Sequence, residues 1–302
     1  MTERMTVIFM ASWVSCNCLG CNPPCREIVE IADKTAVTVV TYNIYRDYFT
    51  RDNPASPQAW SVRRLRVVSL LQACSADIIC LQEDDYVQGE DICKALHYAK
   101  AGVSRYTGSE TTTDLSREGD FNGVYYRSSR FRITDRGHFF FSETPDIPSK
   151  SWDAQANSHC NWFRMEDAAT EKSFYLFNTH LDYVGEQTRL RSVEMLRERI
   201  PQIAGDAPVV LTGDLNDGPE SRPLTGLREF LRDAYWVSET PVKGPEGTFN
   251  DFQDDYDLDR WKFDYILVGG SVRVLTHRIV TEKREGHYPS DHLPVVCDLE
   301  IE

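Results

Sequence analysis

Two features are scarce in this 302-residue sequence, namely long apolar runs and basic residues. No apolar run is long enough to span a bilayer, so the sequence predicts no transmembrane segment. Basic residues are outnumbered, with 33 Lys and Arg against 47 Asp and Glu and a net charge of −14. Because nucleic acids are bound mainly through Lys and Arg, no extended nucleic-acid-binding surface is evident, although a local basic patch can exist on an acidic protein.

The nine cysteines predict neither a disulfide framework nor a zinc site. Cys16, Cys18, Cys21 and Cys25 lie too close together for a zinc site that needs a distant second pair. The remaining cysteines are odd in number and lie in or beside apolar runs, which predicts buried free thiols. They are Cys74, Cys80, Cys93, Cys160 and Cys297.

The first 34 residues are interpreted as a leader or a disordered N-terminal segment. Met5–Val14 is a short apolar stretch behind Arg4, and Cys-Leu-Gly-Cys follows at residues 18–21. The pattern resembles a weak secretory signal, or a lipoprotein signal that ends before Cys21. Its positive charge is low and its apolar run short, so the location stays unknown. A cytoplasmic location is slightly favoured over a secreted or lipid-anchored one.

From residue 35 onward strands and helices alternate without a linker, which predicts one domain over residues 35–302. Short apolar or β-branched runs predict strands at 35–44, 77–81, 103–106, 123–127, 131–141, 160–165, 174–181, 209–211, 265–268, 272–279 and 293–301. Helices are predicted at 62–73, 90–100, 185–200 and 223–232, the first from the helical spacing of Val62, Leu65, Val68 and Leu71. Two mixed, mainly antiparallel sheets packed face to face with helices outside would bury these elements.

Six polar clusters lie at the ends or beginnings of predicted strands. Four clusters follow apolar runs, and two directly precede strands. In order they are Asn43, Glu83, His180, Asp214 with Asn216, Asp264, and Ser290-Asp291-His292. In antiparallel neighbours the end of one strand meets the beginning of the next, so all six clusters can share one rim of the sheets.

The residue types of these clusters indicate a site for a hard divalent cation. Asn43, Glu83 and Asp291, with Asp214 nearby, offer oxygen ligands, and no paired histidines or cysteines accompany them. Oxygen ligands suit Mg²⁺ or Mn²⁺ rather than zinc. Such an ion neutralises the charge that develops on phosphorus during phosphoryl transfer.

The remaining polar residues suit the hydrolysis of a phosphoester by water. Asp214 and Asn216 can aim the attacking water, and His180 can contact a non-bridging or leaving-group oxygen. Asp264 is the natural carboxylate to orient His292. No Ser or Cys lies in a nucleophile-elbow setting, so no covalent intermediate is predicted.

Each of these residues also has a structural interpretation. Asp214 and Asn216 can cap backbone N–H groups in an Asx turn, and Asp264 can begin a strand and bond its own turn. His180 can be a satisfied core histidine. Four arginines between positions 127 and 136 form either a phosphate-steering strip or a solvated strand face, and the latter is favoured. They are Arg127, Arg130, Arg132 and Arg136.

Six short motifs resemble the successive motifs of the endonuclease/exonuclease/phosphatase superfamily. They are Thr-Tyr-Asn-Ile (41–44), Leu-Gln-Glu (81–83), Asn-Thr-His-Leu-Asp (178–182), Thr-Gly-Asp-Leu-Asn (212–216), Phe-Asp-Tyr-Ile-Leu (263–267) and Pro-Ser-Asp-His-Leu-Pro (289–294). The resemblance implies a DNase I-like fold, which is a four-layer α/β/β/α sandwich, and Mg²⁺-dependent phosphoesterase activity. It places the metal on Glu83 with help from Asn43 and Asp291.

The same resemblance implies catalytic roles for Asp214 and Asn216 on the water and for the Asp264–His292 pair. His180 resembles the deadenylase and sphingomyelinase branch of the superfamily. Two positions depart from the expected pattern: His159 lies near a position where an arginine is expected, and Tyr183 stands where a histidine is common.

Three functions are compatible with these observations. The preferred one is a phosphodiesterase that acts on short nucleic acid or a small phosphodiester. The second is a phosphomonoesterase that acts on a sugar or inositol phosphate. The third is a non-catalytic binding module that uses the same cleft. We expect the protein to be a monomer.

Overall fold

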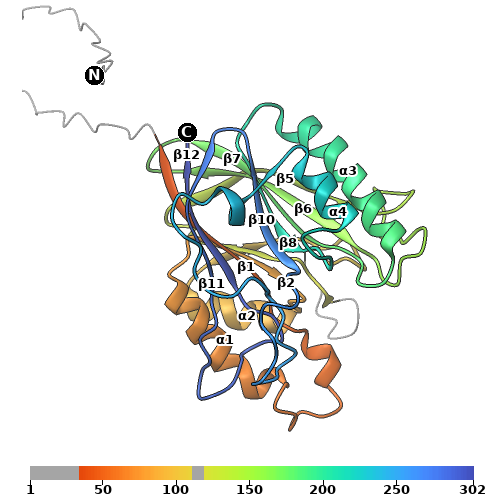
Figure 1. Cartoon of the computed structure of the whole chain (residues 1–302), viewed down its shortest axis with the longest axis vertical. Helices are drawn as coiled ribbons and strands as arrows, with labels where there is room; N and C mark the ends of the chain where they lie inside the picture. The colour runs from red at the N-terminus through yellow and green to blue at the C-terminus, as the bar shows by residue number, and fades with distance from the viewer. Residues whose placement is uncertain (1–33, 111–118) are drawn as a thin grey trace, which may run out of the picture. The chain divides into compact units, whose positions relative to one another are not determined.

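Two six-stranded sheets form the centre of this computed structural model, which describes residues 34–110 and 119–302 (Figure 1). The first sheet has the order β11 (Val272–Ile279), β12 (Val295–Ile301), β1 (Thr35–Asn43), β2 (Ile78–Gln82), β4 (Val124–Tyr126) and β3 (Ala99–Ala101). The second has the order β5 (Phe131–Phe140), β6 (His159–Asp167), β7 (Ser173–His180), β8 (Val209–Asp214), β10 (Asp264–Gly269) and β9 (Arg232–Asp233).

Each sheet is antiparallel except for one parallel pair near its middle. The pairs are β1 with β2 and β7 with β8, and each is joined by a crossover that contains a long helix. Parallel strands end at the same edge of a sheet, so each crossover brings two strand ends side by side. In register, Asn43 lies opposite Gln82, and His180 lies opposite Asp214. The topology alone therefore gathers polar strand ends at one rim.

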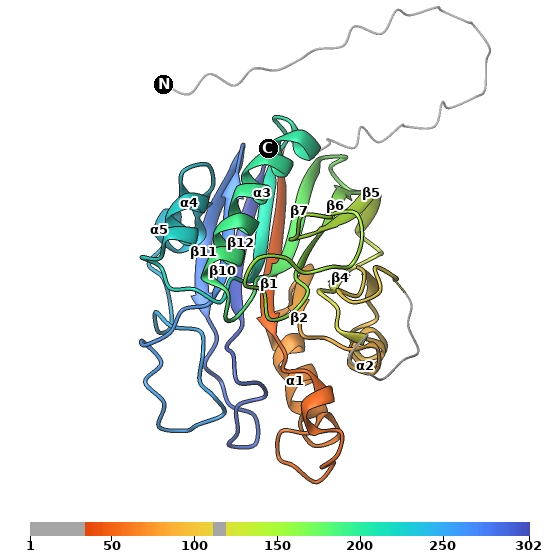
Figure 2. The same cartoon turned by 90° about the vertical axis from the view of Figure 1, so that its right-hand side faces the viewer.

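The helices cover the outer faces of the two sheets. They are α1 (Trp60–Cys74), α2 (Tyr86–Leu96), α3 (Glu186–Ala204), α4 (Arg222–Arg228) and the short α5 (Ala234–Val237), with a 3₁₀ turn at Asp47–Thr50. Figure 1 shows α1 and α2 on one side of the sheets and α3 and α4 on the opposite side, and in Figure 2 α3 runs over the strands of the second sheet.

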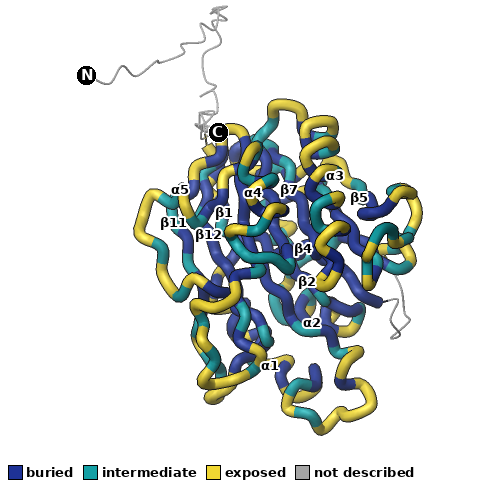
Figure 3. The backbone as a smooth tube through the Cα atoms, turned by 45° about the vertical axis from the view of Figure 1, so that its right-hand side comes forward, coloured by how far each residue is buried: buried dark blue, intermediate teal, exposed yellow. Residues whose placement is uncertain are grey.

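Three apolar clusters separate these layers, because side chains alternate between the two faces of a strand. Val39 and Val210 point between the sheets, whereas their neighbours Val40 and Leu211 pack under α1 and α3 respectively. The buried strands and the exposed loops around them are evident in Figure 3. The predicted four-layer α/β/β/α sandwich of two mixed, mainly antiparallel sheets is confirmed.

Helix α1 forms where predicted, and Val68 and Leu71 of the predicted apolar spacing are buried, but the other two residues of that spacing are not. Val62 and Leu65 are 40% and 71% exposed. The buried face instead includes Trp60, Val67 and Arg63, whose guanidinium is fully buried and donates to backbone carbonyls. A prediction from the spacing of apolar residues alone misplaces part of the buried face, because it assigns a buried arginine to the solvent-exposed face.

Two local predictions are wrong. The helix expected at 90–100 begins at Tyr86, because Asp85 and Gln88 form a reciprocal capping box, and it ends where His97 adopts a left-handed conformation. The strand expected at 103–106 is absent from the described chain. Its Ser104 forms only an isolated bridge to Phe121, and the nearby strand is β3. Every other predicted strand overlaps an observed one.

Several further predictions concern the termini and the cysteines. The predicted leader, including its four cysteines, lies outside the described residues apart from Lys34. The five cysteines of the described chain are free thiols as predicted, and all but the half-buried Cys93 are buried. Among the described helices, none is long and apolar enough to cross a membrane.

Gly213 permits the close approach of β7 and β8 at the rim, which generates a prediction about stability. A Cβ at this position, where φ is +154°, would lie 2.1 Å from the carbonyl oxygen of Thr179. We expect Gly213→Ala to lower the free energy of unfolding by at least about 2 kcal/mol, because a backbone atom cannot yield as a flexible side chain can. Urea denaturation measures the change. Gly218→Ala is the control, since no atom lies within 4 Å of its added Cβ; equal midpoints for the two variants would contradict the argument.

Candidate active site

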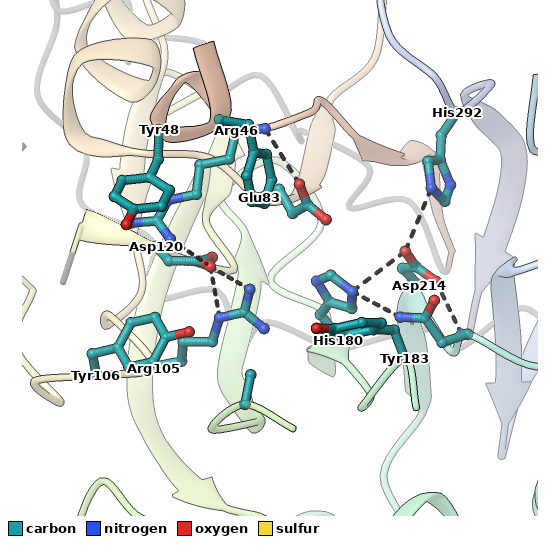
Figure 4. A pocket seen from close by; sticks show the side chains of 13 residues that line it. Arg46, Tyr48, Glu83, Arg105, Tyr106, Asp120, His180, Tyr183, Asp214 and His292 are labelled. Carbon is teal, nitrogen blue, oxygen red and sulfur yellow. Dashed lines mark hydrogen bonds and ion pairs between the residues drawn. The ribbon is translucent and has the colours of Figure 1, made fainter. Parts of the chain in front are cut away.

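A cavity of about 510 Å³ opens at the rim where the strand ends meet (Figure 4). Five of the predicted site residues line it, namely Glu83, His180, Asp214, Asn216 and His292. The other three interact with this group. Asn43 is hydrogen-bonded to Glu83, and Asp264 is hydrogen-bonded to His292. The Asp291 charge contributes to raising the pKa of His292. The fold therefore brings all eight predicted residues together.

The chain turns sharply directly after three of the strands that carry this site. Tyr45, Glu83 and Asn216 adopt left-handed backbone conformations with φ of 55°, 56° and 49°. Such conformations cost free energy in non-glycine residues and are commonly retained at functional sites. Two of the turns are held by side chains, because Asn43 Oδ1 accepts from the Tyr45 N–H and Asp214 Oδ1 accepts from the Asn216 N–H.

Asp214 therefore forms an Asx turn, as its structural interpretation from the sequence allowed. Only its Oδ1 takes part in this turn. Oδ2 accepts a hydrogen bond from Asn43 Nδ2 at 3.0 Å. The same oxygen lies 3.5 Å from His180 Nε2 and 3.8 Å from His292 Nε2. Asp214 thus joins the last residue of β1, in the first sheet, to both histidines of the cavity.

Asn43 and a buried arginine hold the loops that present Glu83 and Asp291. Asn43 Nδ2 also donates to Glu83 Oε1 at 3.1 Å. Ser290 Oγ donates to the Asn43 carbonyl and lies 3.1 Å from Asp291 Oδ1. Arg63, from α1, donates to the carbonyls of Ile44, Tyr45 and Pro289 and so fastens the segment after Asn43 to the segment before Asp291.

Glu83 and Asp291 resist ionisation in the protein alone. Burial raises the pKa of Glu83, and the nearby Asp120 carboxylate raises it further. Burial also raises the pKa of Asp291, to about 6, with a further contribution from the Glu83 charge. Two half-buried, mutually repelling carboxylates are stabilised by a bound cation. The donor set, two carboxylates beside an amide oxygen that retains a free lone pair, fits a hard divalent ion.

A second group of possible ligands, Asp214, Asp264 and His292, places one atom from each residue within 4.8 Å of the others. His292 Nδ1 is committed to Asp264 Oδ2 at 2.8 Å. Burial lowers the pKa of His292, but the Asp264 and Asp214 carboxylates outweigh it and hold the pKa well above 6.5. A protonated imidazole has no lone pair for a metal. This group is therefore better described as an oriented imidazolium than as a metal centre.

His180 has the opposite protonation state. Burial lowers its pKa to about 4, although the Asp214 charge acts in the other direction. The neutral ring is held by Asn216, whose Nδ2 lies 2.9 Å from His180 Nε2 and also donates to the Leu181 carbonyl. The cavity thus presents one neutral and one protonated imidazole on either side of Asp214.

Sequence reasoning missed three charged residues on the opposite wall of the cavity. Arg46 and Arg105 share the carboxylate of Asp120, with Arg46 Nη1 at 3.1 Å and Arg105 Nε at 2.7 Å from Oδ2. These residues lie in loops that begin after different strands, where neither periodicity nor a motif marks them. Figure 4 shows this triad facing His180, Asp214 and His292 across the cavity.

The two departures from the family pattern lie in different environments. His159 is a core residue: it is fully buried and stacked on Phe140, and its Nε2 lies 3.0 Å from the Val103 carbonyl oxygen. Tyr183 is 62% exposed and lines the cavity with Tyr48, Phe49 and Tyr106. Of the four arginines between positions 127 and 136, Arg130, Arg132 and Arg136 form ion pairs with carboxylates, which agrees with the interpretation as a solvated strand face.

The fold defines a class, the DNase I-like α/β/β/α sandwiches. A sequence model of the endonuclease/exonuclease/phosphatase family matches residues 40–292, and the chain belongs to this family. Solved structures of family members share the predicted DNase I-like sandwich.

The similar proteins include phosphatases and nucleases. A family member from Bacteroides vulgatus is 32% identical with a TM-score of 0.79, over 89% of this chain and 100% of that chain. The mannosyl-6-phosphatase of Bacteroides thetaiotaomicron is 29% identical with a TM-score of 0.78, over 87% of this chain and 99% of that chain. The CCR4-Not complex 3'-5'-exoribonuclease subunit Ccr4 of Phaeosphaeria nodorum is 33% identical over 128 residues, 39% of this chain. The chain covers 66%, 29% and 21% of the length of three curated relatives, the last being Ccr4.

The shared carboxylate of Asp120 generates a prediction about stability. Its side chain is 1% exposed, and Asp120→Asn would remove the buried charge that both guanidiniums contact. We expect the free energy of unfolding to fall by about 3 kcal/mol, the cost of breaking a buried ion pair from one side. Thermal or urea denaturation measures it. Glu229→Gln, which breaks the exposed pair with Arg197, is the control and should change stability little. A similar small effect for Asp120→Asn would show that the triad does not depend on that charge.

Proposed function

We propose that this protein is a divalent-metal-dependent phosphoric ester hydrolase that uses an activated water as the nucleophile. One observation supports this most strongly: the half-buried Glu83 carboxylate and an oriented imidazolium line one cavity, connected through Asn43 and Asp214. The family assignment and its phosphatase and nuclease members support the same reaction class.

Glu83 and Asp291 would hold Mg²⁺ or Mn²⁺, with Asn43 orienting Glu83 and offering the second lone pair of its Oδ1. A bound divalent ion supplies neutralisation of the negative charge that accumulates on the phosphoryl oxygens. The pKa values of Glu83 and Asp291 are raised in the protein alone, so a positive charge beside these carboxylates would stabilise their ionised forms.

The remaining residues position the water and stabilise the reacting group. Asp214 accepts a hydrogen bond from the attacking water, and Asn216 keeps His180 beside it in a fixed orientation. His292 donates from Nε2 to a phosphoryl oxygen, since Asp264 holds its Nδ1–H and keeps the ring protonated. Neutral His180 contacts a further non-bridging or leaving-group oxygen. The alternative function, a non-catalytic binding module, does not explain why these acid and base groups are oriented toward one another.

The cavity favours a small phosphomonoester as the substrate. Its volume of about 510 Å³ lies within the range of small-molecule sites, roughly 300–1,000 Å³. Exposed aromatic side chains at Tyr48, Phe49 and Tyr183 offer surfaces for a sugar ring. Similarity to a mannosyl-6-phosphatase over nearly the full length of both chains supports this substrate size.

A phosphodiesterase is the second candidate, and it was the preferred one from the sequence. It is supported by the similarity to Ccr4, which covers a smaller part of this chain. The same carboxylates, histidines and water-positioning groups would serve either ester.

Removal of the metal tests the proposal directly. We expect EDTA to abolish hydrolysis of p-nitrophenyl phosphate and added Mg²⁺ or Mn²⁺ to restore it. Glu83→Gln should raise the metal concentration needed for half-maximal rate at least about 10-fold, since metal-site substitutions commonly cost 10–100-fold in affinity. Glu90→Gln is the matched control, because Glu90 lies on α2 and pairs with Lys100 at the surface. Full activity in EDTA would rule out the metal-dependent mechanism.

Loss of the oriented imidazolium tests the role of His292. We expect His292→Gln to lower kcat by about 10²–10³ while the far-UV circular dichroism stays unchanged, because one donor to a developing oxyanion contributes this much. Asp264→Asn should lower kcat as well, since the ring loses the carboxylate that fixes its tautomer. The exposed His287 provides the control His287→Gln. An unchanged kcat in His292→Gln would remove this residue from the mechanism.

A further inference from the structure

One arginine of helix α3 joins the two loops that follow β7 and β8. Arg189 Nε donates to Asp217 Oδ2 at 2.9 Å, and its Nη1 donates to the Asp182 carbonyl at 2.9 Å. Asp182 lies two residues after His180, and Asp217 lies one residue after Asn216. Arg189 itself is not among the described residues that line the cavity, so it acts there only through these neighbours.

The surroundings of this bridge keep it in one geometry. The side chains of Arg189 and Asp217 are only 11% and 17% exposed, so solvent and salt screen this ion pair less than a surface pair. The Asp182 carboxylate is buried and accepts four backbone N–H groups, which fixes the loop whose carbonyl Arg189 contacts. Those groups belong to Gln155, Ala156, Val184 and Gly185.

The first turn of α3, which carries Arg189, is held as well. Asp153 accepts hydrogen bonds from the backbone N–H groups of Gln187 and Thr188 at 3.2 and 2.8 Å. Arg189 is the next residue, so its backbone cannot shift without weakening these bonds. A planar guanidinium on a fixed backbone can hold two acceptors at once, whereas a lysine ammonium is a point charge without a fixed fork.

The two bridged loops meet at a hydrogen bond that defines the tautomer of His180. Asn216 Nδ2 donates to the Leu181 carbonyl at 3.0 Å and lies 2.9 Å from His180 Nε2. A carbonyl oxygen only accepts, so the amide nitrogen of Asn216 must face Leu181, and its second N–H faces His180 Nε2. Burial lowers the pKa of His180 to about 4, so the ring is neutral at pH 7. Nε2 is then the unprotonated nitrogen, and the ring carries its hydrogen on Nδ1.

Among the described residues, Asn216 is the one that favours this tautomer. His180 Nδ1 is buried without a hydrogen-bond partner in the described chain. Asp214 Oδ2 lies 3.5 Å from His180 Nε2, and a carboxylate there would favour a hydrogen on Nε2 (Figure 4). The left-handed backbone of Asn216 also costs free energy, so neighbouring contacts must hold it. A small displacement of the Asn216 loop therefore exchanges one tautomer for the other.

We propose that Arg189 is a positioning residue. By bridging the two loops it holds Asn216 against His180 and keeps that ring in the Nδ1–H tautomer. In this form His180 has a hydrogen-bond donor at Nδ1 and no free lone pair, so it acts as a donor and not as a general base. The inference rests on the proposed phosphoester hydrolysis and adds the side chain that fixes the state of one of its groups.

Nitrogen NMR of isotope-labelled histidine rings tests the proposal without turnover, and His180→Gln identifies the resonances of this ring. We expect the native protein in Mg²⁺ to show the Nδ1–H tautomer. Arg189→Gln should shift the tautomer ratio at least about 5-fold toward Nε2–H, as for a weakened hydrogen bond. Arg191→Gln is the matched control, because that arginine lies on the same helix and forms an exposed pair with Glu194. An Nε2–H tautomer in the native protein, or an unchanged ratio in Arg189→Gln, would overturn the proposal.

Steady-state kinetics on p-nitrophenyl phosphate in Mg²⁺ provides the second measurement. We expect Arg189→Gln to lower kcat by roughly 10–100-fold and to change KM by less than about 3-fold, because a displaced catalytic group costs rate rather than substrate binding. Arg189→Lys keeps the charge beside Asp217, so it should fold and recover part of the lost rate. Lower stability with an unchanged kcat would show that the bridge is only structural.

A double variant shows whether Arg189 acts through Asn216. Arg189→Gln combined with Asn216→Ala should be no slower than Asn216→Ala alone, since both substitutions weaken the same hydrogen bond. Multiplied losses would contradict the proposed route. If the native protein hydrolyses no phosphoester, the proposed function fails, and the NMR comparison by itself decides the role of Arg189.

Discussion

The hydrogen bond between Asn43 and Asp214 is the contact on which the arrangement of the cavity depends. It joins the last residue of β1 in the first sheet to the last residue of β8 in the second, at 3.0 Å. Asp214 lies opposite His180 in the parallel register and opposite Asp264 in the antiparallel register. One carboxylate therefore sets the relative positions of two sheets, two histidines and, through Asn43, the Glu83 carboxylate. A buried, charge-assisted hydrogen bond of this kind is costly to break, so the geometry is well defined.

The electrostatics of the cavity follow from where each group lies relative to that carboxylate. His292 lies between Asp214 and Asp264, and their combined charge overcomes burial and keeps the ring protonated. Burial dominates at His180 and lowers its pKa to about 4, because the Asp214 and Asp120 charges that raise it are opposed by Arg105 and His292. Burial raises the pKa values of Glu83 and Asp291, and the positive charges around them do not outweigh it. The two histidines thus acquire different protonation states because their charged neighbours differ.

Much of the fold and of the cavity could be predicted from local patterns, and the failures have common causes. Asn43, Glu83, His180 and Asp214 were recognisable because each follows a short apolar run, and strand ends meet at the rim of a sheet. Val62 and Leu65 were wrongly expected on the buried face of α1, because periodicity does not register that Arg63 is buried there and satisfies its guanidinium with backbone carbonyls. Arg46, Arg105 and Asp120 were missed because each lies in a loop, and only the fold brings the segment after β1 beside the connection between β3 and β4.

The sequence by itself determined the α/β class, most of the strands, the family and the polar residues that gather at the cavity. These features depend on residue type and on spacings of a few positions, which a linear chain displays directly. Tertiary structure alone decided which histidine is protonated, which carboxylates face each other, and that two arginines share one aspartate across the cavity from the histidines. Burial and charge interactions over several ångströms control those properties, and they arise only when segments distant in sequence pack against one another.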